Sequence, residues 1–234
     1  MVRNHLKRYA APGFWNIRTK ERTYIVRPTP GAHSIATSVP VKVAICDTLG
    51  LVKSAREASF VLNQGDVVVD GRKVKASGFP VGPMDILSVP KLKQNFRLVT
   101  SKKGLEFVPI EGKDAKRKLC RINGKRTVKG GKIQLELHDG RNIIVKDGSA
   151  YHVGDSVLLE IPGQKIAEHI PLKEGNLILV TGGSHVGQVV KLLDVRHKVM
   201  KPNVAVLAGK VRFETILDYV MPVGVEEPVI NLGG

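Results

Sequence analysis

The sequence has little of what disulfide-stabilised, metal-binding or membrane proteins depend on. Cys46 and Cys120 are the only cysteines among 234 residues, and they do not form a Cys-x-x-Cys pair. They predict neither a zinc site nor a disulfide framework, and Cys46, within an apolar run, is expected to be a small buried hydrophobe. No apolar run is long enough to span a membrane, and no basic segment followed by an apolar one marks a secretion signal. We therefore expect a cytoplasmic chain with no membrane partner.

Recognisable catalytic patterns are also missing. The seven histidines are scattered, and no Cys/His pair has metal-ligand spacing. No nucleophile elbow or paired-carboxylate pattern appears. The glycine-rich residues 181–187 do not form a Walker loop, because no Gly-Lys-Ser/Thr follows them. The sequence thus predicts no enzymatic activity, no cofactor, no metal and no small-molecule substrate.

Positive charge, in contrast, is abundant and unevenly distributed. The formal net charge is +16 and the isoelectric point is about 10.0, as expected of a nucleic-acid-binding protein. Residues 1–132 hold 27 Lys and Arg against 9 Asp and Glu, a net charge of +18. Residues 133–234 hold 10 and 12, a net charge of −2. A basic coat that served only solubility would not be so one-sided.

One stretch has the pattern of a helix followed by a β-hairpin. Ser54 and Glu57 have the spacing of a capping box, and Gly65 suits the left-handed residue that ends a helix. Asp70-Gly71 then predicts a type I′ hairpin turn. Four cations flank these features: Arg56, Arg72, Lys73 and Lys75. Pattern and charge together favour RNA binding, the alternative being an ordinary helix and hairpin with a solvated charged rim.

This helix–hairpin stretch, residues 51–89, resembles the small RNA-binding domain named after bacterial ribosomal protein S-four. The residues that carry the resemblance are Arg56-Glu57-Ala58, Leu62, Gly65, Val67, Val69, Gly71, Val74 and the run Val-Gly-Pro-Met-Asp-Ile-Leu-Ser-Val at 81–89. The resemblance implies that this last run is the closing strand, preceded by a turn. Another helix is expected just before residues 51–89, from Ser38 as a possible cap to about Leu49.

The first 39 residues are basic and interrupted by proline and glycine. Their Arg, Lys and His side chains face a lone acid, Glu21, and Pro12-Gly13 and Pro30-Gly31 break every helix or strand. We therefore expect an extended arm that is poorly ordered alone and orders on its partner. Cations neutralise phosphates, and aromatic side chains between them, Tyr9, Phe14, Trp15 and Tyr24, can stack on unpaired bases. For Phe14 and Trp15, packing against the next domain is an equal alternative.

Two motifs in this segment extend the resemblance to a whole family. Leu-Lys-Arg-Tyr-Ala-Ala-Pro at residues 6–12 and Arg-Pro-Thr-Pro-Gly-Ala-His at 27–33 are similar to the N-terminal signature of the archaeal and eukaryotic-type small-subunit ribosomal protein S-four-e family. Ala32 stands where that signature usually has proline. The resemblance covers essentially the whole chain. It implies a structural protein of the small ribosomal subunit that contacts the 5′ region of the small-subunit RNA and neighbouring ribosomal proteins.

Residues 91–132 hold the densest charge, 14 Lys and Arg against 3 Asp and Glu. Alternating apolar and polar residues, with turns expected at Asn123-Gly124 and Asp139-Gly140, predict the short hairpins of a small β-barrel. We favour a phosphate-tracking surface over a merely solvated face. The expected contacts are Lys116, Arg117, Lys118, Arg121, Lys125 and Arg126.

Residues 177–193 resemble a KOW motif, the glycine-centred hairpin of an SH3-like barrel. Gly182 and Gly183 allow the backbone to turn sharply and approach a phosphate. His185 can donate a hydrogen bond to RNA, although a loop histidine is as often only exposed. This part of the chain is therefore expected to approach RNA through backbone donors rather than cations.

Together these patterns predict an α+β, mostly-β fold in five parts. They are a basic N-terminal arm (1–37), an S-four-type RNA-binding domain of two helices and a small sheet (38–90), a central β-barrel-like domain (91–171), an SH3-like KOW barrel (172–220) and a C-terminal tail (221–234). The RNA contacts expected before residue 91 are Arg3, Lys7, Arg8, Trp15, Arg18, Lys20, Arg22, Arg27, His33, Arg56, Arg72, Lys73 and Lys75.

Two rival functions are weaker. An RNA-modifying enzyme or a tRNA synthetase with an appended S-four-type module would need a catalytic domain for which this chain has no room. A non-ribosomal, KOW-containing transcription elongation factor would not explain the basic N-terminal segment.

Overall fold

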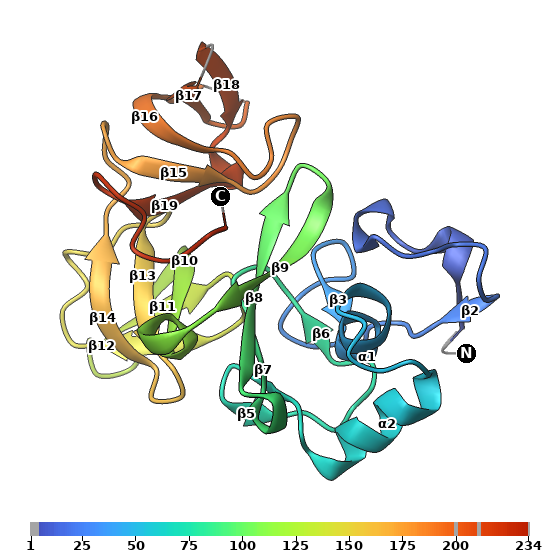
Figure 1. Ribbon diagram of the computed structural model, residues 1–234. Helices are drawn as coiled ribbons and strands as arrows, with labels where there is room; N and C mark the ends of the chain where they lie inside the picture. Colours follow the sequence, from blue (N-terminus) through green and yellow to red (C-terminus); the bar gives the residue numbers. More distant parts are fainter. Residues whose placement is uncertain (1–4, 199–200, 210–211, 234) are drawn as a thin grey trace. The chain divides into compact units, whose positions relative to one another are not determined.

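The computed structural model describes residues 5–198, 201–209 and 212–233 (Figure 1). The chain divides into two compact units. Unit 1 comprises Met1–Val99 and Lys103–Ala115, and unit 2 comprises Thr100–Lys102 and Lys116–Gly234. Three five-stranded antiparallel sheets and few helices make the fold mostly β, as predicted.

The N-terminal segment of unit 1 is folded. Strands β1 (Leu6–Lys7) and β2 (Tyr24–Ile25) pair antiparallel, and the short helices η1 (Arg8–Ala10) and η2 (Gly13–Trp15) lie between them in sequence. Trp15 is only 1% exposed and lies in the unit 1 core. Its indole N–H donates to the Ser38 carbonyl at 2.8 Å. The prediction of an arm that orders only on a partner is therefore wrong here, because this segment buries its own apolar residues.

The helix expected from Ser38 begins three residues later. Strand β3 (Val39–Pro40) pairs with β6 (Pro80–Val81), and only then do α1 (Val41–Val43) and the π-helical turn η3 (Ala44–Thr48) follow. The Ser38 hydroxyl donates to the Ser34 carbonyl at 2.6 Å instead of capping a helix. Strand pairing thus outcompetes a local cap at this position.

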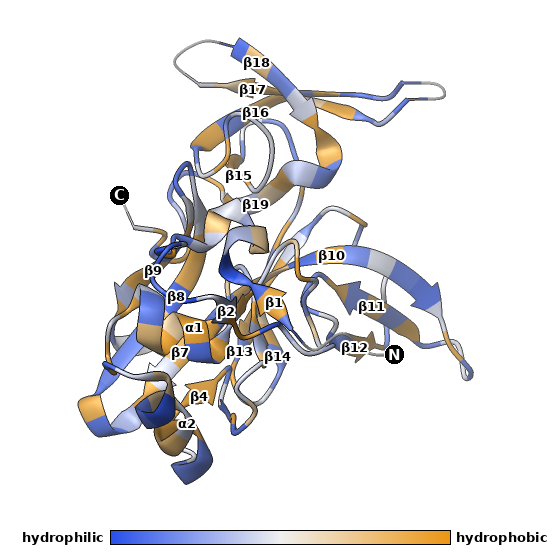
Figure 2. Cartoon of the chain, turned by 90° about the vertical axis from the view of Figure 1, so that its right-hand side faces the viewer, coloured by the Kyte–Doolittle hydropathy of each residue, from blue (hydrophilic) through white to orange (hydrophobic). Residues whose placement is uncertain are grey.

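Helix α2 (Ala55–Gln64) confirms the predicted capping box. The Glu57 amide donates to Ser54 Oγ and the Ser54 amide to Glu57 Oε2, both at 3.2 Å. Gly65 ends the helix at a φ of 77°, in the left-handed region. Ala58 and Leu62 are buried on the inner face, and Figure 2 shows hydrophobic and hydrophilic residues alternating along α2.

The sheet of unit 1 has the strand order β5-β4-β7-β8-β9. Its strands are β4 (Val68–Val69), β5 (Arg72–Lys73), β7 (Ile86–Val89), β8 (Gln94–Ser101) and β9 (Gly104–Ile110), with the short helix η4 (Pro90–Leu92) before β8 and η5 (Gly112–Lys116) after β9. Asp70 and Gly71 have φ values of 48° and 78°, which confirms a turn with both central residues left-handed, as type I′ requires.

The first sheet of unit 2 has the order β12-β11-β10-β13-β14. It comprises β10 (Arg117–Thr127), β11 (Ile133–Leu137), β12 (Asn142–Val145), β13 (Ser156–Glu160) and β14 (Lys165–Ile170). The turn predicted at Asn123-Gly124 is wrong, because β10 continues through it with a register shift between Ile122 and Gly124. Gly130 and Gly131, at φ values of 85° and 70°, lie between β10 and β11 instead. Figure 2 shows the hydrophilic end of β10 that precedes them.

The second sheet of unit 2 has the order β18-β17-β16-β15-β19. It comprises β15 (Leu177–Val180), β16 (Val189–Arg196), β17 (Val204–Ala208), β18 (Arg212–Ile216) and β19 (Val220–Gly224), with η6 (Leu217–Tyr219) before the last strand. The sequence predicts a loose tail from residue 221, and for β19 this prediction is wrong. Strand β19 pairs with β15 and buries Met221 and Val223. Pro222 is tolerated because β19 is an edge strand of this sheet.

No helix among the described residues is long and apolar enough to cross a membrane. Across the same described ranges, no group of three or more His, Cys, Asp or Glu side chains is arranged to hold a metal ion.

Candidate RNA-binding surface

Four exposed cations form what we call the α2–hairpin surface: Arg56, Arg72, Lys73 and Lys75. Within the described residues, none of these side chains makes an ion pair. Arg56 lies in the first turn of α2, whereas the Lys73 side chain passes 3.7 Å from the position that a Cβ on Gly65 would occupy, at the other end of the helix. At 1.5 Å per residue, roughly 13 Å of helix separates these ends. The cations are therefore spread along a face and are not gathered at one point.

A second group of exposed cations lies in the N-terminal segment: Lys7, Arg18, Lys20, Arg22 and Arg27. Two tyrosines accompany them, since Tyr9 is 74% and Tyr24 57% exposed. The Lys7 ammonium lies 5.5 Å from the Tyr9 ring centroid, within cation–π distance. Exposed aromatic faces between cations are what unpaired bases stack on. The RNA contacts predicted from the sequence include Trp15 but neither tyrosine, although Tyr9, Trp15 and Tyr24 all lie between cations in the sequence.

Arg8 is not part of this exposed group, contrary to prediction. Its buried guanidinium pairs with Asp47, lies 3.5 Å from the Glu21 carboxylate and donates to the Arg18 carbonyl at 2.7 Å. These contacts tie η1 to η3, so Arg8 holds the N-terminal segment in place. Arg3 lies outside the described residues.

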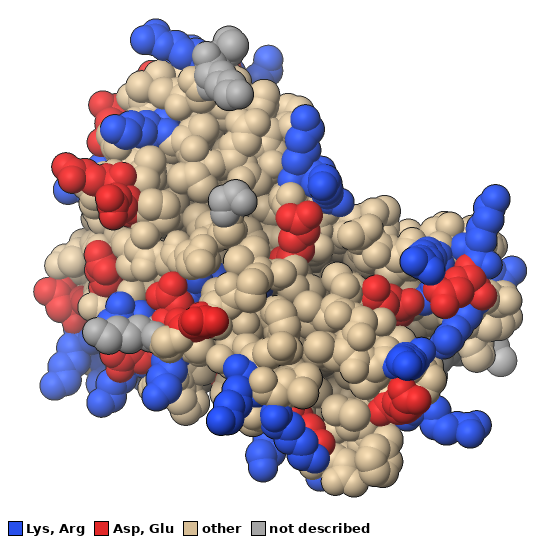
Figure 3. Space-filling view, in the orientation of Figure 1, with Lys and Arg blue, Asp and Glu red and all other residues tan. Residues whose placement is uncertain are grey.

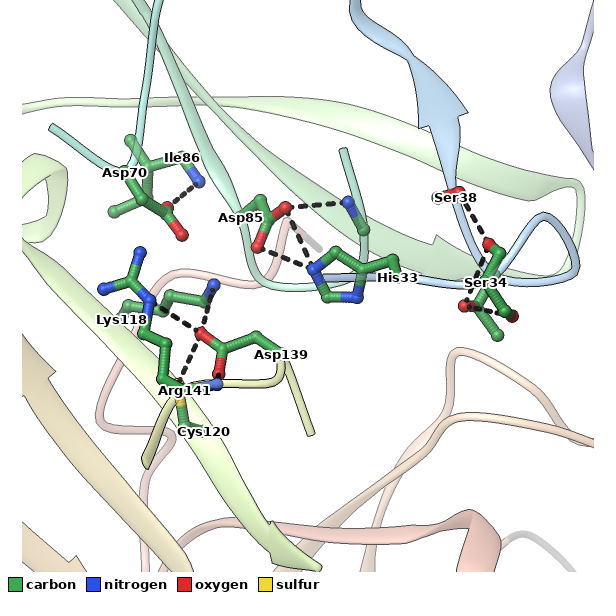
Figure 4. Close-up of polar contacts among 12 residues, drawn as sticks. His33, Ser34, Ser38, Asp70, Asp85, Ile86, Lys118, Cys120, Asp139 and Arg141 are labelled. Carbon is green, nitrogen blue, oxygen red and sulfur yellow. Dashed lines mark hydrogen bonds and ion pairs between the residues drawn. The ribbon is translucent and has the colours of Figure 1, made fainter. Parts of the chain in front are cut away.

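His33 is likewise buried. Its Nε2 lies 3.2 Å from Asp85 Oδ1, and Asp85 Oδ2 accepts from the Gly82 amide at 2.8 Å (Figure 4). A Cβ on Gly82 would lie 2.2 Å from the His33 ring, so only glycine fits beneath it. His33 therefore fastens the N-terminal segment to the turn before β7, and we leave Arg8, Trp15 and His33 out of the proposed RNA contacts.

The most deeply buried of the predicted contacts is Lys118 on β10. Its ammonium is fully buried and lies 2.8 Å from Asp139 Oδ2, which Arg141 Nε also approaches at 3.1 Å (Figure 4). Burial alone would raise the pKa of Asp139, but the charge and hydrogen bond of Lys118 outweigh it, and the pKa is lowered. The sequence places Lys118 in a basic run, yet this side chain balances an internal charge.

Other basic residues of unit 2 are partly engaged within the protein. Arg121 donates to the carbonyls of Asp218 and Leu217 at 2.8 and 3.3 Å, and burial lowers the pKa of its guanidinium against the opposing charge of Asp218. Lys125 donates to the Gly148 carbonyl at 2.7 Å, and Arg126 Nε lies 2.9 Å from Glu136. Lys125 and Arg126 remain exposed, as does Lys116, whereas Arg117 is half-buried.

Two positions in the loop between β15 and β16 favour glycine. A Cβ on Gly182 would lie 2.8 Å from the Tyr219 ring, and Gly183 is exposed with a φ of 87°. The His185 ring is half-buried and stacks on Phe213, with centroids 3.9 Å apart. The Phe213 ring therefore covers one face of the His185 ring.

Figure 3 shows Lys and Arg side chains extending from the surface, with acidic side chains between them. Exposed cations beside exposed tyrosines can contact the phosphates and the unpaired bases of a nucleic acid.

Three family models match the chain. They are the RS4NT (NUC023) domain at residues 2–36, the S4 domain at 43–87 and the ribosomal family S4e at 92–166. The chain is 41% identical to the small ribosomal subunit protein eS4 of Methanocaldococcus jannaschii over 240 residues, which covers 98% of each chain. It belongs to the ribosomal protein S4e family. Within this S4e family, the protein eS4 of Methanothermobacter thermautotrophicus is 44% identical over 238 residues, which covers 99% of this chain and 97% of its own length.

A solved S4e structure supports the fold. The crystal structure of the 30S ribosomal protein S4e from Thermoplasma acidophilum matches with a TM-score of 0.72 at 32% identity, over 81% of this chain and 96% of its own. The resemblance inferred from the N-terminal motifs is thereby confirmed.

Proposed function

We propose that this chain is a structural constituent of the small ribosomal subunit that binds ribosomal RNA and supports subunit assembly and translation in the cytoplasm. S4e relatives that match nearly its whole length are named small ribosomal subunit proteins. The observation that carries the proposal is the α2–hairpin surface, four exposed cations without internal ion pairs on the part of the chain that matches the S4 domain.

The mechanism is electrostatic and geometric. Each cation that neutralises a phosphate releases condensed counterions, which drives binding without any need for base recognition. The folded units supply a fixed shape against which structured RNA can pack. No group on the α2–hairpin surface has to donate a proton or bind a metal for this function.

We further propose that residues 172–224 form an SH3-like barrel of the KOW type. Strands β15 to β18 form an antiparallel meander, and β19 pairs with β15 at its edge; this sheet and the glycine loop between β15 and β16 support the assignment.

Salt dependence tests the proposed grip on RNA. We expect the affinity of the full chain for small-subunit ribosomal RNA to fall with KCl with a log–log slope more negative than about −4, because several phosphates are neutralised. A filter-binding titration between 50 and 200 mM KCl measures this slope. A slope near zero would show that shape or protein contacts, and not cations, dominate binding.

The α2–hairpin surface is tested by a double variant, Arg56→Ala with Arg72→Ala. Losing two phosphate contacts should make the slope less negative by roughly 1.8, about 0.9 for each contact. The melting temperature should barely move, since both side chains are exposed and unpaired. The matched control is Lys165→Ala with Lys191→Ala, two exposed lysines on strands of unit 2, which should leave the slope unchanged.

Two other outcomes of this comparison would contradict the assignment. A collapse in melting temperature of the Arg56/Arg72 variant would mean that these residues hold the fold. An equal loss of slope in the Lys165/Lys191 control would mean that the slope responds to any pair of exposed cations, and the α2–hairpin surface would have no special part in binding.

A further inference from the structure

Unit 1 contains a cavity of about 250 Å³ between the β1–β2 sheet and the helical turns α1 and η3. Ile25 and Val43 contribute apolar wall, and Arg22 and Lys42 contribute cations. The volume lies below the range of roughly 300–1,000 Å³ typical of pockets for drug-sized ligands. A cavity of this size and lining suits one flat ring system that carries a negative charge at one end.

Tyr24 supplies an aromatic wall. Its ring lines the cavity and is still 57% exposed, and the His5 ring centroid lies 5.7 Å from it at an interplanar angle of 52°. Because its ring is partly exposed, Tyr24 can present an aromatic face to a ligand in the cavity. Every nucleobase has a π-face that can stack on such a ring.

The cations at the cavity are available to a phosphate. Arg22 is exposed and makes no ion pair within the described part of the chain. Lys42 is half-buried, and its Nζ donates to Ser59 Oγ at 2.8 Å, which leaves further donors on the ammonium. Asp47, the acidic group in the lining, already pairs with Arg8.

From these contacts we propose that the cavity holds one unpaired nucleotide of the bound RNA. Tyr24 stacks on the base, and Arg22 and Lys42 hold the adjoining phosphate. The proposal rests on the proposed RNA-binding function and adds to it a site that selects a base turned out of a helix. Single-stranded, unstacked bases are what proteins usually read in RNA.

The test uses the full chain, small-subunit ribosomal RNA and three variants. Tyr24→Ala should weaken binding by roughly five- to a hundredfold, the range found when one base–aromatic stack is lost. Tyr24→Phe keeps the ring and should bind within about twofold of wild type. Phe60→Ala is the matched control, because Phe60 is an exposed aromatic residue of the same unit, 64% exposed, and does not line the cavity. Its affinity should stay near that of the wild type.

Salt dependence and chemical probing separate the roles. The slope of log affinity against log salt should be unchanged in Tyr24→Ala and less negative by about one in Arg22→Ala. Probing of unpaired bases with dimethyl sulfate and a carbodiimide should reveal one base protected by wild type, Tyr24→Phe and Phe60→Ala. That base should become reactive in the Tyr24→Ala complex at saturating protein.

Identical protection patterns for wild type and Tyr24→Ala would overturn the pocket while leaving RNA binding intact. So would protection of no unpaired base by the wild-type chain, a result that needs no variant to fold and that would favour a side chain of a neighbouring protein as the occupant. A wild-type chain that binds no ribosomal RNA would overturn both the pocket and the proposed function.

Discussion

Replacing Trp15 by alanine is expected to lower the free energy of unfolding by about 3–5 kcal/mol, the usual cost of removing a buried tryptophan. Trp15 is 1% exposed and lies in the same core as Val41, Leu62 and Leu98. The change also strands the buried Ser38 carbonyl, which accepts the indole N–H at 2.8 Å, and an unpaired buried acceptor adds to the loss. Urea unfolding followed by circular dichroism measures the effect.

Phe60→Ala is the matched control for Trp15→Ala. Phe60 is an aromatic residue of the same unit, but it lies on the outer face of α2 and is 64% exposed. Its loss should change the free energy of unfolding by less than about 0.5 kcal/mol. If Trp15→Ala kept wild-type stability and lost RNA affinity instead, Trp15 would be a stacking residue and the core described above would be wrong.

Deletion of the N-terminal segment should, like Trp15→Ala, lower the free energy of unfolding. A segment that became ordered only on RNA could be removed without destabilising the fold. Residues 5–33, however, include the buried Trp15, and they supply Arg8 to the pair with Asp47 and His33 to the contact with Asp85. The segment is therefore part of the architecture of unit 1, and its effect on RNA affinity cannot be separated from stability by truncation. Point substitutions at exposed side chains, such as Arg22 and Tyr24, are the informative experiments.

Features that depend on a few neighbouring residues were predictable from the sequence. The capping box of Ser54 and Glu57, the left-handed Gly65 and the Asp70-Gly71 turn are each fixed by local backbone chemistry, and all three are confirmed. Asn123-Gly124 has an equally strong turn signal, yet it lies within β10. Pairing of β10 with β11, from Ile122 to Thr127, outweighs the local preference there, as tertiary contacts often do.

Burial of charged residues was not predictable, because it depends on partners far along the chain. Arg8 pairs with Asp47, 39 residues away, and the Trp15 indole reaches a carbonyl 23 residues away. In the sequence both residues sit among cations and aromatics that favour RNA contact. Only the fold separates those that face inward from exposed ones such as Arg22 and Tyr24, and charge counts alone therefore overstate the number of RNA contacts.

Lys118 gives the sharpest case, since Lys118→Met is expected to cost about 3–5 kcal/mol at pH 7. Removing one partner of a buried pair leaves the other charge poorly compensated. Here the Asp139 carboxylate loses the ammonium 2.8 Å away and keeps the partly exposed Arg141 guanidinium, whose Nε lies 3.1 Å from it, so the cost should fall toward the lower end of this range. The matched control is Lys91→Met, which breaks the Lys91–Asp66 pair of similar length, 2.6 Å, at a lysine that is 67% exposed. An exposed pair contributes about 0–1 kcal/mol, so the two variants should differ clearly in urea unfolding.

The pH dependence identifies the cause. The folded pKa of Asp139 lies below its usual value, so its ionised form stabilises the wild-type protein above about pH 3.9, and this stability is lost as pH falls through the folded pKa. In Lys118→Met the main opposing charge is gone, so burial should raise the pKa of Asp139 and make its ionised form unfavourable near neutral pH. The difference in free energy of unfolding between wild type and variant should therefore be largest at pH 7 and shrink as pH approaches 3. A difference that stayed constant with pH would assign the cost to lost packing of the lysine side chain and not to the Asp139 charge.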